Sequence, residues 1–225
     1  MTVNNPYIDL VADHPDIWSD IEKIYSQSGK WSEVFKIKNP IYLEIGTGMG
    51  NFFGGEVREN PEINYVGMEI KYKRLYITAE KAHGRKATQV KNPEIWKDDA
   101  TNFVLLKDFA QNIDKIFWEA EITQSYIFFP DPWPKDRHKK HRLLQTDFLN
   151  NIYTITQSAG KCIIKTDHRE YFDFVLEQLS QTQWKQVRKS YDWESEEDYD
   201  SSKDTEFQKI TKKHTEKVNY LELQK

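Results

Sequence analysis

The chain contains very little cysteine and no long hydrophobic run. Cys162 is the one cysteine in 225 residues, which excludes an internal disulfide and a metal site built from several cysteines. A single thiol indicates a reducing compartment, and we expect the cytoplasm. No apolar stretch approaches the roughly twenty residues that a helix needs to cross a bilayer. The first 18 residues also lack the basic-then-apolar pattern of a secretion signal, so we expect neither secretion nor a membrane span.

The net charge is also small, at -4, but it is unevenly distributed. Residues 192–200 hold six acidic residues and no basic residue, which leaves the remainder at +2. We expect this acidic stretch to be an exposed loop that its self-repulsion keeps mobile. No repeat or low-complexity linker divides the chain, and 38% hydrophobic residues suffice for one core. We therefore expect a single domain over residues 1–225, in which 1–38 form an N-terminal extension without recognisable chemistry.

Strand and helix signals alternate along the chain. Apolar runs predict strands over residues 41–45, 65–69, 123–129 and 161–165. Amphipathic periodicity predicts helices over residues 71–83, 101–110, 143–156 and 169–179. A last strand pair is predicted near residues 183–189 and 206–211. This order is typical of a doubly wound α/β fold with a mainly parallel sheet, which binds ligands at the carboxyl ends of its strands.

A glycine loop follows the first of these strands. Gly46, Gly48 and Gly50 should open a helix, and such a loop lets backbone approach a ligand closely. The dinucleotide pattern G-x-G-x-x-G would need a third glycine at Asn51, which disfavours NAD. Glu44 places a carboxylate beside the loop, where a cationic or amine-bearing ligand is favoured. S-adenosylmethionine, with its sulfonium and its ammonium, fits that requirement.

Two further acids occur in the order that a nucleoside site needs. Glu69 closes the second strand, 23 residues after Gly46, near the position of an acid that accepts both ribose hydroxyls. Asp99 follows the region of the third strand, where it would accept from the adenine amino group. The alternative is a glycine turn with three exposed acids. The order of all these residues at strand ends favours the cofactor site.

Residues 128–142 combine a held carboxylate with a cationic run. Pro130 and Pro132 have fixed φ and no N–H, so they hold Asp131 in a stiff turn that suits catalysis. The run from Lys135 onward has one opposing acid, Asp136, and favours a polyanion such as nucleic acid. The alternative is a proline turn before a solvated helix start. No third ligand accompanies the two histidines, so we expect no metal. The expected RNA contacts are Arg137, His138, Lys139, Lys140, His141 and Arg142.

These motifs, taken in order, resemble those of the tRNA (guanine-N7-)-methyltransferases over residues 41–208. The early motifs are shared by many class I methyltransferases, whereas Pro-Asp-Pro-Trp followed by the basic run is specific to this family. The resemblance implies a Rossmann-like seven-stranded sheet with helices on both faces. It also implies S-adenosyl-L-methionine as cofactor, tRNA and not DNA as partner, and 7-methylguanosine in the variable loop as product. The matching segments are 43–50, 67–69, 99–100, 129–135, 166–167 and 205–207.

The resemblance also assigns roles to individual residues. The family's cofactor contacts correspond to Glu44, Glu69, Asp99 and Asp131. Its substrate contacts correspond to Lys135, Asp167, Thr205, Glu206, Phe207 and Gln208. The family usually has Glu at the last of these positions, and Gln can accept a hydrogen bond but brings no negative charge. Asp167 fits equally well as the N-cap of the helix expected from Arg169.

The chemistry agrees with this resemblance. Guanine N7 has an exposed lone pair and attacks a sulfonium methyl without losing a proton, so no general base is required. The transition state needs in-line alignment and stabilisation of developing positive charge, which a held Asp131 supplies. Two alternatives remain: another class I methyltransferase, and a non-catalytic RNA-binding module on the same fold. The intact glycine loop and the four acids favour an enzyme.

Overall fold

One mixed sheet organises the protein. The computed structural model describes residues 5–88, 102–211 and 217–225, and within them eight strands form a sheet in the order β1-β4-β3-β2-β5-β6-β8-β7. All neighbouring strands pair in parallel except β8, which is antiparallel to both β6 and β7. The strands are β1 (Ile17–Trp18), β2 (Ile41–Ile45), β3 (Asn64–Met68), β4 (Phe103–Leu106), β5 (Ile122–Phe128), β6 (Thr156–Thr166), β7 (Lys185–Ser190) and β8 (Asn219–Gln224).

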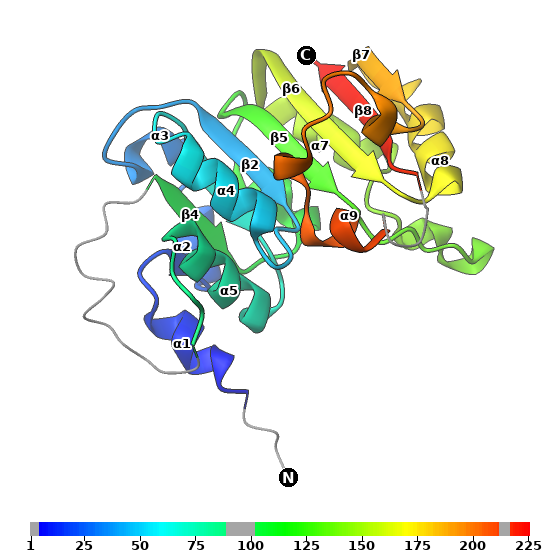
Figure 1. Ribbon diagram of the computed structural model, residues 1–225. Coiled ribbons are helices and arrows are strands. Elements are labelled where there is room, and N and C mark those ends of the chain that lie inside the picture. Colours follow the sequence, from blue (N-terminus) through cyan, green and yellow to red (C-terminus); the bar gives the residue numbers. More distant parts are fainter. Residues whose placement is uncertain (1–4, 89–101, 212–216) are drawn as a thin grey trace.

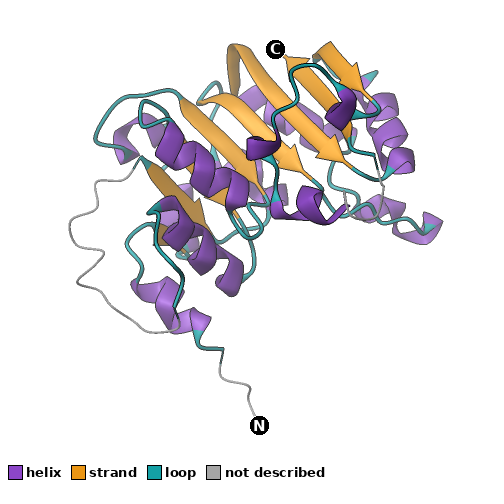
Figure 2. Ribbon diagram, in the orientation of Figure 1, coloured by secondary structure: helices purple, strands orange, loops and turns teal. Residues whose placement is uncertain are grey.

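Helices cover both faces of this sheet (Figures 1 and 2). One face packs against α1 (Tyr7–Asp13), α4 (Asn51–Glu59) and α5 (Tyr72–Ala82). The larger core, on the other face, includes residues from α2 (Ile21–Tyr25), α3 (Trp31–Val34), α6 (Ile113–Ile116), α7 (Thr146–Ile155) and α8 (Arg169–Leu179). The other helices of the described residues are α9 (Glu206–Thr211) and the 3-10 turns η2 (Ala110–Asn112), η3 (Asp136–His141), η4 (Trp193–Ser195) and η5 (Ser201–Lys203).

The topology places the switch point at β2. The chain passes from β2 to β3 on one side, whereas β5 pairs with β2 on the other side. Ligands of doubly wound sheets bind in the crevice that such a reversal opens at the carboxyl ends of the strands. The glycine loop, Glu69 and the Asp131 turn follow β2, β3 and β5 respectively. The fold therefore gathers these motifs along one edge of the sheet.

Most predicted elements are confirmed, and two are wrong. The strand at 41–45 and the helix at 169–179 have the predicted bounds, and the strand predicted near 183–189 is β7. The helix predicted over 101–110 is instead β4 followed by η2, because Phe103–Leu106 is buried on both faces between β1 and β3. A short, fully buried apolar run does not reveal its period. The strand predicted at 206–211 is α9, and β8 supplies the missing strand.

The N-terminal extension is part of the core. Leu10, Ile17 and Trp31 are buried, and the Trp31 indole donates to the Ile116 carbonyl oxygen at 2.7 Å. The extension also adds β1 at the edge of the sheet, so the sheet has one strand more than the predicted seven. No helix in the described ranges is both long and apolar enough to span a bilayer.

The acidic segment 192–200 is anchored at several points. Trp193 is buried and stacks on Tyr220, with ring centroids 3.9 Å apart. Arg188 of β7 pairs with Glu196 at 2.9 Å and also with Asp198. The positive charge of Arg188, which lies outside the segment, thus offsets part of the segment's negative charge. The predicted mobility of this loop stays a prediction.

Candidate active site at the carboxyl ends of the strands

The glycine loop connects β2 to α4 in a left-handed conformation. Gly46, Gly48 and Gly50 have φ of +82°, +56° and +73°, values that favour glycine. A Cβ at Gly46 or Gly48 would meet no heavy atom within 4 Å, whereas a Cβ at Gly50 would lie 2.6 Å from Thr78 of α5. The first two glycines therefore border open space, and the third lets the loop pack against α5.

Glu69 ties the glycine loop to the end of β3. One carboxylate oxygen accepts hydrogen bonds from the backbone N–H groups of Ile70 and Lys71, at 2.8 and 3.0 Å. The other accepts from Gly48 N at 3.2 Å and lies 3.5 Å from Arg74. Three backbone donors and one guanidinium hold this buried carboxylate at the mouth of the loop.

Glu44 is the most deeply buried acid of the site. Its side chain lies on β2 and is 3% exposed. Burial raises the pKa of Glu44 well above its ordinary value, the nearby carboxylates of Glu56 and Glu69 raise it further, and Lys165 opposes them. Glu44 Oε2 and Thr47 Oγ1 are buried and accept no hydrogen bond from the described residues. A cationic ligand with hydrogen-bond donors suits these two oxygens.

The Asp131 turn is strained on both sides of the carboxylate. Phe129 and Trp133 have φ of +52° and +44°, which bulky residues rarely adopt. Phe129 N donates to the Lys165 carbonyl oxygen at 2.8 Å, and the Arg142 guanidinium donates to Pro132 O at 2.9 Å. The turn is thus held at both ends while Asp131 itself is exposed. This geometry suits a carboxylate that meets a ligand.

The cationic run forms η3, and one of its members is structural. Lys135, Arg137, Lys140 and His141 are exposed. Arg142 is 2% exposed, with its guanidinium 5.2 Å and 4.9 Å from the ring centroids of Tyr171 and Phe174. The expectation that Arg142 contacts RNA is therefore corrected: it lies under the turn and supports it.

Two other members of the run have partners nearby. Lys139 pairs with Asp136 at 2.8 Å and with Glu170 at 2.7 Å, which offsets its charge. His138 is half-buried, and its ring centroid lies 5.7 Å from that of Trp133. The free cationic charge of η3 is therefore concentrated on Arg137 and Lys140, next to Lys135.

Asp167 follows β6 and is half-buried. The prediction that Asp167 is the N-cap of α8 is wrong, because His168 occupies that position. The His168 Nδ1 accepts a hydrogen bond from Tyr171 N at 3.1 Å. An imidazole nitrogen can replace the usual carboxylate or hydroxyl oxygen as cap acceptor. Substrate contact by Asp167 stays a prediction.

The segment from Thr205 forms α9, which lies beside the Asp131 turn (Figure 1). Thr205 Oγ1 accepts from Gln208 N at 3.0 Å, as an N-cap does. Phe207 is 47% exposed, and its ring centroid lies 5.0 Å from that of Phe129. Glu206 lies 3.5 Å from Lys81 of α5. The first turn of α9 thus joins the cofactor side of the site to the Asp131 side.

Gln208 is fully buried, which the sequence did not indicate. Its amide nitrogen donates to Glu194 Oε1 at 3.2 Å, so it links α9 to η4. Glu194 belongs to the acidic stretch, and the sequence did not indicate its contact with α9. Asp99, the expected adenine contact, lies outside the described residues.

Lys165 is another residue that sequence reasoning missed. Its side chain is buried on β6, and its ammonium lies 4.8 Å from the ring centroid of Phe128. It lines a cavity of about 250 Å³, together with residues of α4, β5 and η4. The sequence did contain a signal for it, because a lysine at the end of the apolar run 162–165 is expected at the carboxyl end of a buried strand. Its positive charge opposes the rise in the pKa of Glu44.

The mostly parallel sheet, the glycine loop after β2 and the acid after β3 define a class I methyltransferase. A family model described as "Putative methyltransferase" matches residues 38–221. The chain belongs to the tRNA (guanine-N7-)-methyltransferase family. It is 39% identical to a protein of that name from Lachnoclostridium phytofermentans, over 70% of this chain and 68% of the relative. It is 36% identical to one from Bacillus subtilis, over 77% of this chain and 74% of the relative.

Solved structures share the fold at low sequence identity. A 16S rRNA methyltransferase, KamB, matches with a TM-score of 0.57 at 13% identity, over 92% of this chain and 94% of that one. An antibiotic-related methyltransferase matches with a TM-score of 0.55 at 15% identity, over 100% and 96% of the two chains. These likenesses confirm the predicted fold class.

Proposed function

We propose that this chain transfers the methyl group of S-adenosylmethionine to N7 of a guanosine in the variable loop of tRNA, which forms 7-methylguanosine. The observation that carries the proposal is the strained Asp131 turn, held by Arg142 at the carboxyl end of β5, beside the glycine loop of β2. We place this reaction in the cytoplasm and assign it to one domain over residues 1–225.

The cofactor side of the site is proposed to consist of the glycine loop and three acids. Gly46 and Gly48 leave room for the ligand, and Glu69 would accept from the ribose hydroxyls. Glu44 Oε2 and Thr47 Oγ1, both buried, would accept from the cationic amino-acid part. The proposed adenine contact is Asp99. When bound, S-adenosylmethionine supplies an electrophilic methyl group on a sulfonium.

Asp131 is proposed to act electrostatically. Guanine N7 attacks with a free lone pair, so positive charge grows on the purine and no proton has to leave. A carboxylate held near the purine stabilises that charge more in the transition state than in the ground state. The rigid turn keeps Asp131 from relaxing away, and this preorganisation is its contribution to the rate.

The RNA side is proposed to combine charge with aromatic surface. Lys135, Arg137 and Lys140 would contact phosphates, which favours binding without reading sequence. Enzymes that modify a base in folded nucleic acid turn it out of its stack, and the base then stacks on apolar or aromatic side chains. Phe207 and Trp133, both partly exposed around Asp131, offer such rings. Asp167 and the start of α9 would orient the guanine.

The test is to incubate the purified chain with S-adenosylmethionine and tRNA that lacks modifications, and then to map the methylated nucleoside by mass spectrometry. We expect 7-methylguanosine at one guanosine of the variable loop. A matched tRNA with adenosine at that position should accept no methyl group. Methylation at another atom or position, or none, would contradict the proposal. Calorimetric titration with S-adenosylmethionine separates an inactive RNA-binding module, which would not bind it.

A further inference from the structure

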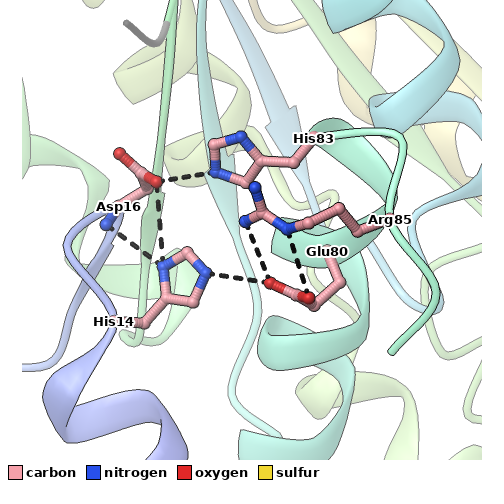
Figure 3. Close-up of polar contacts among 5 residues, drawn as sticks. All are labelled: His14, Asp16, Glu80, His83 and Arg85. Atoms are coloured by element: carbon pink, nitrogen blue, oxygen red, sulfur yellow. Dashed lines mark hydrogen bonds and ion pairs between the residues drawn. The ribbon is translucent and has the colours of Figure 1, made fainter. Parts of the chain in front are cut away.

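A buried cluster of imidazoles and carboxylates joins the N-terminal segment to the end of α5 (Figure 3). His14 and Asp16 lie between α1 and β1, Glu80 lies in the last turn of α5, and His83 follows α5. The side chains of His14 and His83 are 0% and 6% exposed. Two elements that are more than 60 residues apart thus meet through polar groups inside the protein.

The three facing atoms of this cluster are close together. Asp16 Oδ2 lies 2.8 Å from His83 Nε2 and 3.8 Å from His14 Nδ1. One donor atom from each of the three residues lies within 4.8 Å of the other two. In a tetrahedral zinc site with bonds of about 2.0–2.1 Å, neighbouring ligand atoms are roughly 3.3 Å apart. The distances from Asp16 Oδ2 to His83 Nε2 and to His14 Nδ1 each differ from that spacing by well under an ångström, so small side-chain shifts would bring both pairs to it.

The tautomer of His14 is set for ligation. The carboxylate of Glu80 accepts a hydrogen bond from the Arg85 guanidinium at 3.1 Å and faces the His14 ring. The backbone N–H of Asp16 can only donate, so His14 Nδ1 is the acceptor and His14 Nε2 carries the proton, which it donates to Glu80 at 3.4 Å. The one lone pair of His14 Nδ1 accepts from Asp16 N at 3.2 Å, so it lies on the Asp16 side, and an ion bound there would replace this hydrogen bond. A carboxylate on the far nitrogen is the usual outer partner of a metal-bound histidine.

We propose that His14 Nδ1, Asp16 Oδ2 and His83 Nε2 bind a divalent transition-metal ion of the zinc type. Two imidazole nitrogens and one carboxylate oxygen suit zinc, and solvent can supply the fourth ligand because the Asp16 side chain is 12% exposed. Binding displaces the proton that His83 Nε2 shares with Asp16 and leaves two neutral imidazoles and a carboxylate on the ion. Glu80 orients His14 from outside the site.

The ion would act as a structural clasp. It would tie the segment between α1 and β1 to the end of α5, and α5 packs Thr78 against Gly50. In the same helix, Lys81 donates to Asn51 at the start of α4 at 2.6 Å. The clasp would therefore steady the helix that supports the glycine loop, and we expect its main effect on stability and not on the chemical step.

The experiment uses the full chain, freed of metal with a chelator. Zn²⁺ titration by calorimetry and native mass spectrometry should show one ion per chain, and Co²⁺ should give the visible absorption of a four-coordinate site. Asp16→Asn and His83→Gln should each weaken Zn²⁺ binding at least about tenfold. Glu80→Gln should weaken it by about 10- to 100-fold through His14, as loss of an outer partner does.

Two comparisons separate the clasp from a plain hydrogen-bond network. Asp16→Asn keeps an oxygen that accepts from His83, so this variant should still fold. If the cluster is only a hydrogen-bond network, Zn²⁺ should change the stability of neither the wild type nor Asp16→Asn. If it is a metal site, Zn²⁺ should stabilise the wild type more than the variant. The control is His138→Gln with His141→Gln, which removes the surface histidine pair whose rings lie 6.3 Å apart. The control should keep Zn²⁺ binding. No bound ion, binding unchanged in folded Asp16→Asn, or binding abolished in the control would each overturn the proposal.

Discussion

The amide nitrogen of Gln208 donates a hydrogen bond to a carboxylate oxygen of Glu194 at 3.2 Å, in a part of the protein where Gln208 is fully buried. The bond joins the first turn of α9 to η4. A glutamate at position 208, expected from the family resemblance, would place a second carboxylate against Glu194. The negative charge that this chain lacks at position 208 is therefore present at Glu194, one hydrogen bond away.

We predict that Gln208→Glu lowers the free energy of unfolding. The change replaces a buried donor with a like charge, which should cost about 1–3 kcal/mol. The double variant Gln208→Glu with Glu194→Gln should recover most of that loss, because the hydrogen bond is restored in reverse. Urea unfolding of the wild type, the two single variants and the double variant gives the coupling energy between positions 194 and 208. The matched control is Gln186→Glu on the exposed edge of β7, which should leave the free energy of unfolding nearly unchanged. Equal stability of the single variant and wild type would refute the pairing.

We predict that binding of S-adenosylmethionine releases protons from Glu44. Burial raises the pKa of Glu44, followed in size by the effects of Glu56 and Glu69, so the cofactor-free protein holds a proton that an ordinary glutamate loses. A cationic ligand favours the carboxylate and expels that proton. Calorimetry in two buffers of different ionisation enthalpy measures the number released. Glu44→Gln should release fewer, and an equal number in both proteins would contradict the assignment.

The same shift predicts a pH dependence of stability. The folded pKa of Glu44 lies above its unfolded value, so above the unfolded value the folded state binds more protons than the unfolded state. The contribution of Glu44 is then most favourable at low pH and is lost as pH rises through the folded pKa. Glu44→Gln should flatten that decline in unfolding experiments from acidic to alkaline pH without cofactor. A decline of the same slope in the variant would assign it to other groups.

We predict different consequences for the exposed and buried members of the cationic run. Replacing Arg137 and Lys140 with Gln should lower tRNA affinity and reduce the slope of log affinity against log salt by about 0.7–0.9 for each phosphate that the variant no longer neutralises. Arg142→Gln should instead lower the free energy of unfolding by about 1.5–3 kcal/mol, since it removes a charged donor from Pro132 O. If the slope is unchanged after Arg137 and Lys140 are replaced, η3 is a solvated surface that does not contact tRNA.

We predict that Asp131→Asn slows methyl transfer far more than it weakens binding of either substrate. Asn keeps the size and an acceptor, but it loses the charge that stabilises the purine, which should cost on the order of 100-fold in rate. Single-turnover methylation across pH is the measurement. No titration limb near neutrality should depend on Asp131, because N7 loses no proton. If Asp131→Asn is as fast as the wild type, Asp131 has no catalytic role. If the wild type shows a titration limb near neutrality that the variant lacks, Asp131 acts as a general base.

The local sequence was sufficient wherever one strand end and the residues after it define a feature. The strand at 41–45, the glycine loop and the helix at 169–179 were predictable, because their apolar period and their glycines are properties of consecutive residues. The buried run Phe-Val-Leu-Leu at 103–106 has no alternation, so its period suited a helix as well as a strand. Only its place between β1 and β3 decided that it is β4.

By itself, the sequence determined the fold class, the order of the motifs and the chemistry of each candidate side chain. Only the tertiary structure decided which of those side chains face each other: Arg142 with Pro132, Gln208 with Glu194, and His14 with Glu80. The physical reason is that burial and pairing depend on neighbours brought in from distant parts of the chain. Arg142 belongs to a run of exposed cations by composition, but the rings of α8 bury it.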